Sequence, residues 1–127
     1  MIEEVIGSDS GTLADLASRA ILQSVEATPA IKEEMIEHTE AHLGQGLSSA
    51  DHIFLKYVDE KAILGFILLK DAWNLCDLFV EPSAHNQGLG KALFREALSI
   101  AISKENRGYV RVNSSLNAEG FYRSLGF

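Results

Sequence analysis

Cysteine, basic residues and long apolar runs are all scarce in this sequence. Its one cysteine, Cys76, has no partner for an internal disulfide, and an apolar neighbourhood favours a small buried side chain over a reactive thiol. Lys and Arg number 11 against 18 Asp and Glu, which gives a formal net charge of -7. A nucleic-acid surface needs clustered positive charge, so we expect no nucleic-acid partner, whereas a cationic substrate is compatible with this balance.

No apolar segment approaches the length of about 20 residues that a membrane-spanning helix requires. Residues 1–4 are acidic and show neither the basic region nor the apolar core of a secretory signal. We therefore expect no membrane partner and a cytoplasmic location. A length of 127 residues with 46% hydrophobic content allows one domain, residues 1–127, with a core of its own.

Hydrophobic periodicity alternates between helical and strand patterns along the chain. Helices are expected at about 13–21, 30–43, 88–103 and 117–125, and strands within 1–6 and at 52–58, 61–69, 73–80 and 109–112. The strand at 61–69 is apolar on both faces and should be central, and Gly65 within it indicates a bulge or a close approach. The strands at 73–80 and 109–112 flank a helix, so they should pair in parallel.

The stretch from Phe79 to Leu93 carries the strongest functional pattern. A strand ends at Pro82, and a helix begins at Gly88 and Gly90. Free backbone N–H groups and the positive end of the helix dipole make such a junction an anion site, and glycine allows a phosphate to approach the backbone closely. The P-loop pattern is not met, and the dinucleotide fingerprint would require a third glycine where Leu93 stands.

The same spacing resembles the pyrophosphate loop of the GNAT superfamily of acyl-CoA-dependent N-acyltransferases. That family pattern is Val-x-Pro, then Arg/Gln-x-x-Gly-x-Gly/Ala and a helix, and the chain reads Val80-Glu81-Pro82, then His85-Asn86-Gln87-Gly88-Leu89-Gly90. His85 replaces the usual Arg or Gln, which affects only the side-chain contribution to phosphate binding. Residues 112–127 resemble the second family signature, Ser/Asn-x-x-Ala-x-x-Phe/Leu-Tyr-x-x-x-Gly-Phe.

This resemblance implies an α/β (α+β) fold with a central mixed, mostly antiparallel sheet flanked by helices, acetyl-CoA as co-substrate, and no metal. The implied cofactor contacts are Leu78, Phe79, Val80, His85, Asn86, Gln87, Gly88, Leu89, Gly90, Lys91, Ser115 and Asn117. Ser115 and Asn117 would serve equally well as caps of the last helix. The family fold continues with one or two strands beyond the position of Phe127, so we expect an edge that is incomplete or supplied by another chain, for example in a homodimer.

Acyl transfer to an amine requires proton movement in two places: an ammonium group must lose a proton before it attacks, and the departing thiolate must gain one. The resemblance assigns the acid role to Tyr122, which would otherwise be a core aromatic. Asp77 is the nearest candidate for the base and could instead contact a cationic substrate. Glu81, Glu26, Glu119 and a relay through ordered water remain open.

Two further patterns concern the helix at 30–43 and the connection before it. His38 and His42 are four residues apart, but a metal site would need another ligand, and the acidic neighbours favour a solvated face. The resemblance places residues 25–29 at the edge of an acceptor groove. We expect an N-acetyltransferase that transfers an acetyl group to a primary amine of a small molecule or peptide by direct attack in a ternary complex. A catalytically inactive acyl-CoA sensor is the alternative, and an unrelated helix–sheet domain would bind no CoA.

Overall fold

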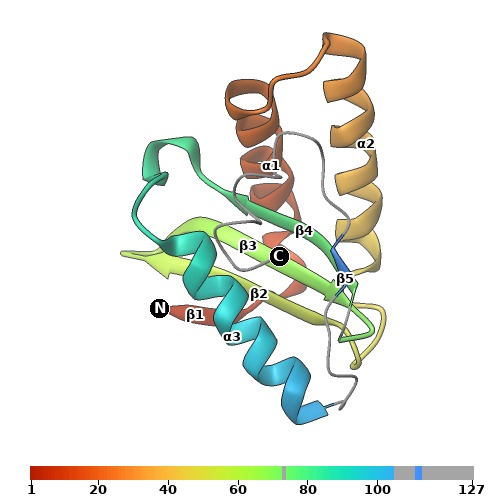
Figure 1. Ribbon diagram of the computed structural model, residues 1–127, viewed down its shortest axis with the longest axis vertical. Helices are drawn as coiled ribbons and strands as arrows, with labels where there is room; N and C mark the ends of the chain where they lie inside the picture. Colours follow the sequence, from red (N-terminus) through yellow and green to blue (C-terminus); the bar gives the residue numbers. More distant parts are fainter. Residues whose placement is uncertain (73, 105–110, 113–127) are drawn as a thin grey trace.

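The computed structural model describes residues 1–72, 74–104 and 111–112 (Figure 1). Its elements are β1 (Ile2–Glu4), α1 (Ser10–Ser24), α2 (Pro29–Gln45), β2 (Ile53–Asp59), β3 (Ala62–Lys70), β4 (Asn74–Val80), α3 (Leu89–Lys104) and β5 (Arg111–Val112). These strands form one sheet in the order β1-β2-β3-β4-β5, antiparallel except for the parallel pairing of β4 with β5. The expected mixed, mostly antiparallel sheet and the expected parallel pair are confirmed.

Helices cover both faces of the sheet, with α3 on one face and α1 and α2 on the other (Figure 1). The hydrophobic core therefore has two parts, one on each face of the sheet. Ile67 and Leu69 of β3 pack with α3, whereas Phe66 and Leu68 pack with α1, and all four side chains are fully buried. The expectation of a central strand covered on both faces is therefore confirmed. No helix in the described part of the chain is long and apolar enough to cross a membrane.

The β2–β3 hairpin shows why the element boundaries differ slightly from expectation. Glu60 and Lys61 both adopt positive φ, at 49° and 71°, so they form the turn and β3 begins at Ala62 instead of residue 61. The pairing register then shifts between Tyr57 and Val58. A Cβ added at Gly65 would lie 3.0 Å from the carbonyl oxygen of Phe79, which confirms the expected close approach.

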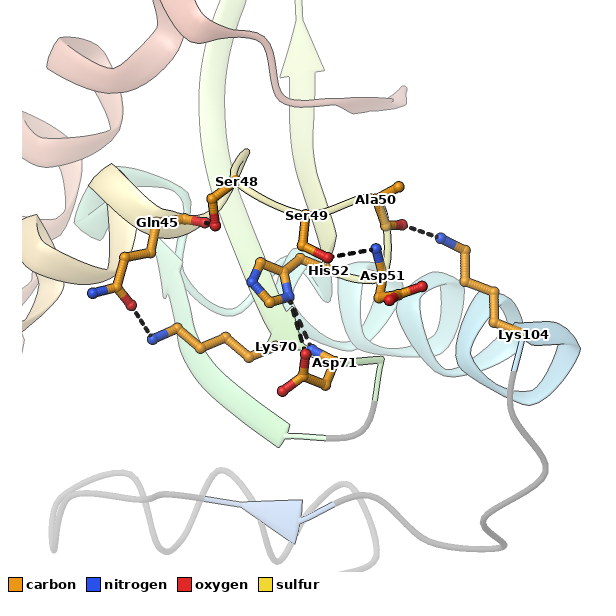
Figure 2. A network of polar contacts seen from close by, with 9 residues as sticks. All are labelled: Gln45, Ser48, Ser49, Ala50, Asp51, His52, Lys70, Asp71 and Lys104. Atoms are coloured by element: carbon orange, nitrogen blue, oxygen red, sulfur yellow. Dashed lines mark hydrogen bonds and ion pairs between the residues drawn. The ribbon is translucent and has the colours of Figure 1, made fainter.

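A polar network fixes the end of the sheet where β4 begins (Figure 2). Lys104 Nζ donates to the carbonyl oxygen of Ala50 (2.8 Å) and so ties the end of α3 to the loop before β2. The backbone N–H of Asp71 donates to His52 Nδ1 (3.0 Å), which ties the same loop to the β3–β4 turn. Lys70 Nζ reaches Gln45 Oε1 at the end of α2 (2.6 Å). The end of β3 and the β3–β4 turn are therefore tied to α2 and to the loop before β2.

Candidate active site

The glycine loop lies between the end of β4 and the start of α3. After β4 the chain makes a short 3-10 turn (Pro82–Ala84), and Gly88 then adopts a φ of 78°. The carbonyl oxygen of Gly88 accepts from the N–H of Ala92 (3.0 Å), so the N–H groups of Leu89, Gly90 and Lys91 precede the first hydrogen bond of the helix. Apart from the neighbouring residues in the chain, no atom of the described residues lies within 4 Å of a Cβ added at Gly88. An anion can therefore approach these backbone donors.

His85 stands where the family loop pattern usually has Arg or Gln. Its Nε2 donates to the carbonyl oxygen of Val80 (2.9 Å), so the ring turns back onto the end of β4. The side chain thereby closes the loop onto the strand. Asn86 and Gln87, which follow it, are exposed, as is Lys91 in the first turn of α3.

Arg19 of α1 braces the same loop from the other side of the sheet. Its guanidinium binds the Glu81 carboxylate in a bidentate pair, with Nε to Oε1 at 2.9 Å and Nη2 to Oε2 at 2.6 Å. The hydrogen bond from Arg19 lowers the pKa of Glu81. A carboxylate that is already paired and has a lowered pKa is a poor proton acceptor, which argues against Glu81 as the base.

Beyond Leu75, one edge of β4 has no strand partner among the described residues, and we call it the open edge. The N–H of Glu81 donates to the carbonyl oxygen of Leu64 (2.8 Å), so residues 81 and 79 direct their backbone groups toward β3. The backbone groups of Leu78 and Val80, which alternate with these, point away from β3. In the described residues β5 pairs there only with Asn74 and Leu75.

Some of the backbone groups that were expected to contact the cofactor already have partners within the protein. The carbonyl oxygen of Phe79 points toward Gly65, and its backbone is used by β3. Val80 has its carbonyl oxygen occupied by His85. The N–H of Val80 and both backbone groups of Leu78 are therefore what the open edge offers to a ligand.

Asp77 and His42 form a pair that joins β4 to α2. His42 Nδ1 lies 3.2 Å from Oδ1 and 3.0 Å from Oδ2 of Asp77, and Thr39 also hydrogen-bonds this carboxylate. The Asp77 side chain is only 4% exposed, whereas that of His42 is 30% exposed. Burial raises the pKa of Asp77, and the contacts with His42, Lys70 and Thr39 work against that rise.

The expected solvated face is confirmed for His38 and is wrong for His42. His38 is exposed, but His42 turns inward with Thr39 and Leu43, which are both buried. A helical spacing of three and four residues links Thr39, His42 and Leu43, so this pattern in the sequence already carried the signal. In the part of the chain that is described, no group of three His, Cys, Asp or Glu side chains could hold a metal ion.

A groove of about 560 Å³ runs between the α1–α2 connection and α2. It is lined by Leu22, Ala27, Pro29, Lys32, Glu33, Ile36, Glu37 and Glu40. Residues 25–29, expected at the acceptor edge, thus contribute to it. Neither the glycine loop nor the His42–Asp77 pair lines this groove, so it is not the reaction centre itself.

Several expected site residues lie outside the described residues. These are Tyr122, Ser115, Asn117 and Glu119, together with the helix expected at 117–125 and positions 73, 109 and 110 of two expected strands. Their roles stay predictions.

Comparisons with known proteins agree with this geometry. A family model described as an acetyltransferase (GNAT) domain matches residues 19–127. A comparison with curated protein sequences finds no match. The fold is similar to that of a GCN5-related N-acetyltransferase from Rhodopseudomonas palustris, with a TM-score of 0.82, 21% identity, and coverage of 99% of this chain and 79% of that one.

Two further solved structures share the fold. The PaiA N-acetyltransferase from Thermoplasma acidophilum, solved in complex with coenzyme A, has a TM-score of 0.76 and 23% identity over 98% of this chain and 85% of that one. An aminoglycoside 6'-N-acetyltransferase from Acinetobacter haemolyticus has a TM-score of 0.70 and 14% identity over 100% of this chain and 90% of that one.

Proposed function

Because this chain belongs to the acetyltransferase (GNAT) domain family, we propose that it transfers an acetyl group from acetyl-CoA to a primary amine of a small molecule or peptide, by direct attack in a ternary complex. The observation that carries this proposal is made on the described residues: β4 has an edge without a strand partner beyond Leu75, and the N–H groups at the start of α3, just after β4, are free. An acyl-CoA needs both features, one for its extended amide-bearing arm and one for its phosphates.

The pyrophosphate would rest against the N–H groups of Leu89, Gly90 and Lys91, beside Gln87 and Gly88, where the helix dipole favours negative charge. The pantetheine arm would pair with the backbone of Leu78 and Val80 in the manner of an added strand. A backbone N–H at this edge would also stabilise negative charge on the thioester oxygen during attack. The coenzyme A bound to the Thermoplasma protein supports acetyl-CoA as co-substrate.

The proton acceptor for the attacking amine is proposed to be built around Asp77. This buried carboxylate directly precedes Leu78, the residue whose backbone faces the open edge. The acceptor is proposed to be cationic before it reacts, because the groove along α2 carries Glu33, Glu37 and Glu40. Tyr122 remains the predicted acid for the departing thiolate.

The first test of this function is release of the CoA thiol in the presence of a panel of primary amines. We expect Gly88→Glu to weaken acetyl-CoA binding by about 100-fold or more, because the new side chain places bulk and negative charge against the phosphates and strains a backbone with positive φ. Calorimetric titration with acetyl-CoA measures this affinity.

Gly11→Glu is the matched control, because Gly11 is exposed on α1 and also has open space around an added Cβ. It introduces the same charge and should leave the affinity unchanged. Wild-type affinity in Gly88→Glu would refute the assignment of the loop. Tight acetyl-CoA binding without thiol release from any amine would refute the enzymatic activity and leave a binding protein.

A further inference from the structure

The hydrogen bond between His42 and Asp77 has a defined donor and a defined acceptor. A carboxylate can only accept, and Nδ1 of His42 faces both of its oxygens at 3.0 and 3.2 Å, so Nδ1 carries the ring proton. Nε2 is then the nitrogen with the free lone pair. It has no partner among the described residues, and the side chain is 30% exposed.

The pair also connects the interior of the sheet to the surface. Asp77 pairs with Leu68 of β3, whose side chain packs beneath α1, and Phe79 lies two residues further along the same face. The Asp77 carboxylate therefore lies on the face of the sheet covered by α1 and α2. Leu78, the next residue, packs on the α3 face. His42 of α2 lies on this same α1–α2 side, hydrogen-bonded to the strand that carries the open edge, and its side chain is partly exposed.

We propose that His42 is the general base of the acetyl transfer and that Asp77 is its positioning partner. This inference rests on the proposed function and changes one part of it, because the proton acceptor becomes Nε2 of His42 instead of the Asp77 carboxylate. Asp77 fixes the tautomer and the orientation of the ring, and its negative charge stabilises the imidazolium once formed. Thr39 in turn holds the carboxylate.

The proton and electron transfers balance as follows. The acceptor ammonium gives one proton to His42 Nε2, which later releases it to solvent. The amine lone pair forms the new C–N bond, the C–S bond breaks, and its electron pair leaves on sulfur. The nitrogen loses a second proton as the amide forms, and this loss balances the one proton that the thiolate takes up to leave as the thiol, so the net reaction releases a single proton to solvent.

Other charged or titratable groups surround the carboxylate from each neighbouring element. Thr39 and His42 hydrogen-bond it from α2, and Cys76 precedes it in β4. Burial raises the pKa of this carboxylate, and the positive charge of Lys70 in β3 lowers it. Burial raises the pKa of the Cys76 thiol, so it stays neutral at the pH where a histidine titrates. Lys70 is engaged with Gln45 Oε1 at 2.6 Å. His42 is thus the group of this cluster with a free acceptor atom.

The main test is a pH profile of kcat/KM for His42→Gln with a primary amine. We expect the rate to fall by about 100- to 10,000-fold, the acid limb of the profile to disappear, and the acetyl-CoA dissociation constant to stay within about twofold. His38→Gln is the matched control on an exposed position of the same helix and should behave as wild type. Added imidazole should restore part of the rate to His42→Ala.

Asp77→Asn separates the positioning role from the catalytic one. An amide retains the hydrogen bond to Nδ1 but cannot stabilise an imidazolium, so the acid limb should remain and move to lower pH. A wild-type profile in His42→Gln would overturn the proposal. An equal loss of acetyl-CoA affinity in that variant would assign the pair a structural role.

The tautomer can be tested without turnover. We expect long-range ¹H–¹⁵N spectra of the full chain to show the proton of the neutral His42 ring on Nδ1, and a proton on Nε2 would overturn the proposal. A wild-type protein that binds acetyl-CoA yet acetylates no amine would instead refute the proposed function. The two failures are therefore distinguishable.

Discussion

Asp77 is a carboxylate in the interior of a small protein, with 4% of its surface exposed and apolar residues on both sides of the sheet. Burying a carboxylate disfavours its charged form, and the partners His42, Thr39 and Lys70 only partly offset this. A folded-state pKa above the unfolded value means that folding favours the protonated carboxyl. That contribution to stability is present in full below the unfolded pKa and is lost as the pH rises through the folded pKa.

Asp77→Asn should therefore make the protein more stable at pH 8, by roughly 0.5–2 kcal/mol in the free energy of unfolding, while it slows acetyl transfer. The difference should vanish near pH 3, where the wild-type carboxyl is protonated. Urea unfolding at a series of pH values measures it. Asp59→Asn at the exposed end of β2 removes the same charge from the surface and should show no such gain. A less stable Asp77→Asn protein at pH 8 would mean that the hydrogen bonds of the Asp77 carboxylate with His42 and Thr39 outweigh the cost of its burial.

Single residues show where sequence reasoning ends. Asp77 was a candidate because it lies in the strand directly before Leu78, one of the expected backbone contacts. His42 was assigned to a solvated face because the glutamates around it dominate the polar side of the helix. Which of Leu78 and Phe79 directs its backbone outward depends on the pairing of Glu81 with Leu64, and no local pattern encodes that register.

Elements were more predictable than residues, because hydrophobic periods of 3.6 and 2 extend over whole helices and strands. The boundaries of the helices and strands were less predictable. Glu60 and Lys61 adopt positive φ without glycine, and α2 continues to Gln45, two residues beyond the expected end at residue 43. How α1 contacts the glycine loop could not be predicted, because Arg19 and Glu81 are 62 residues apart in the sequence.

The Arg19–Glu81 pair should affect cofactor binding more than stability. Arg19 is 46% exposed, and an ion pair of this kind contributes at most about 1 kcal/mol to folding. It nevertheless fixes the residue directly after β4. We expect Arg19→Glu to raise the acetyl-CoA dissociation constant by about 3- to 10-fold, because like charges would push the loop out of place.

The charge-swapped variant Arg19→Glu/Glu81→Arg is the decisive comparison, since it restores the pair and the net charge. Its acetyl-CoA affinity, measured by calorimetry, should recover to within about twofold of wild type. If the double variant binds as weakly as Arg19→Glu, the contact does not position the loop.

At the scale of the whole molecule, the order of the two sequence signatures was enough to predict the sheet and its helices. The groove along α2 was not readable in the same way, because it is formed by side chains of α1, α2 and their connection, which carry no motif. Its acidic lining agrees in sign with the net charge of -7. Both features should attract a cation from solution.

This charge predicts that salt slows the reaction of a charged acceptor and leaves that of an uncharged acceptor unchanged. At saturating acetyl-CoA, kcat/KM for a diamine that carries two positive charges should fall by about 3- to 10-fold between 20 and 300 mM salt, because the screening length shrinks to about 6 Å over that range. An aromatic amine that is neutral at the same pH should show no change. Since the groove is not lined by His42 or Asp77, kcat itself should remain constant. The double variant Glu33→Gln/Glu37→Gln should reduce the salt dependence of kcat/KM for the diamine and leave that of the aromatic amine unchanged. An equal salt dependence for both acceptors would show that these glutamates do not guide the substrate.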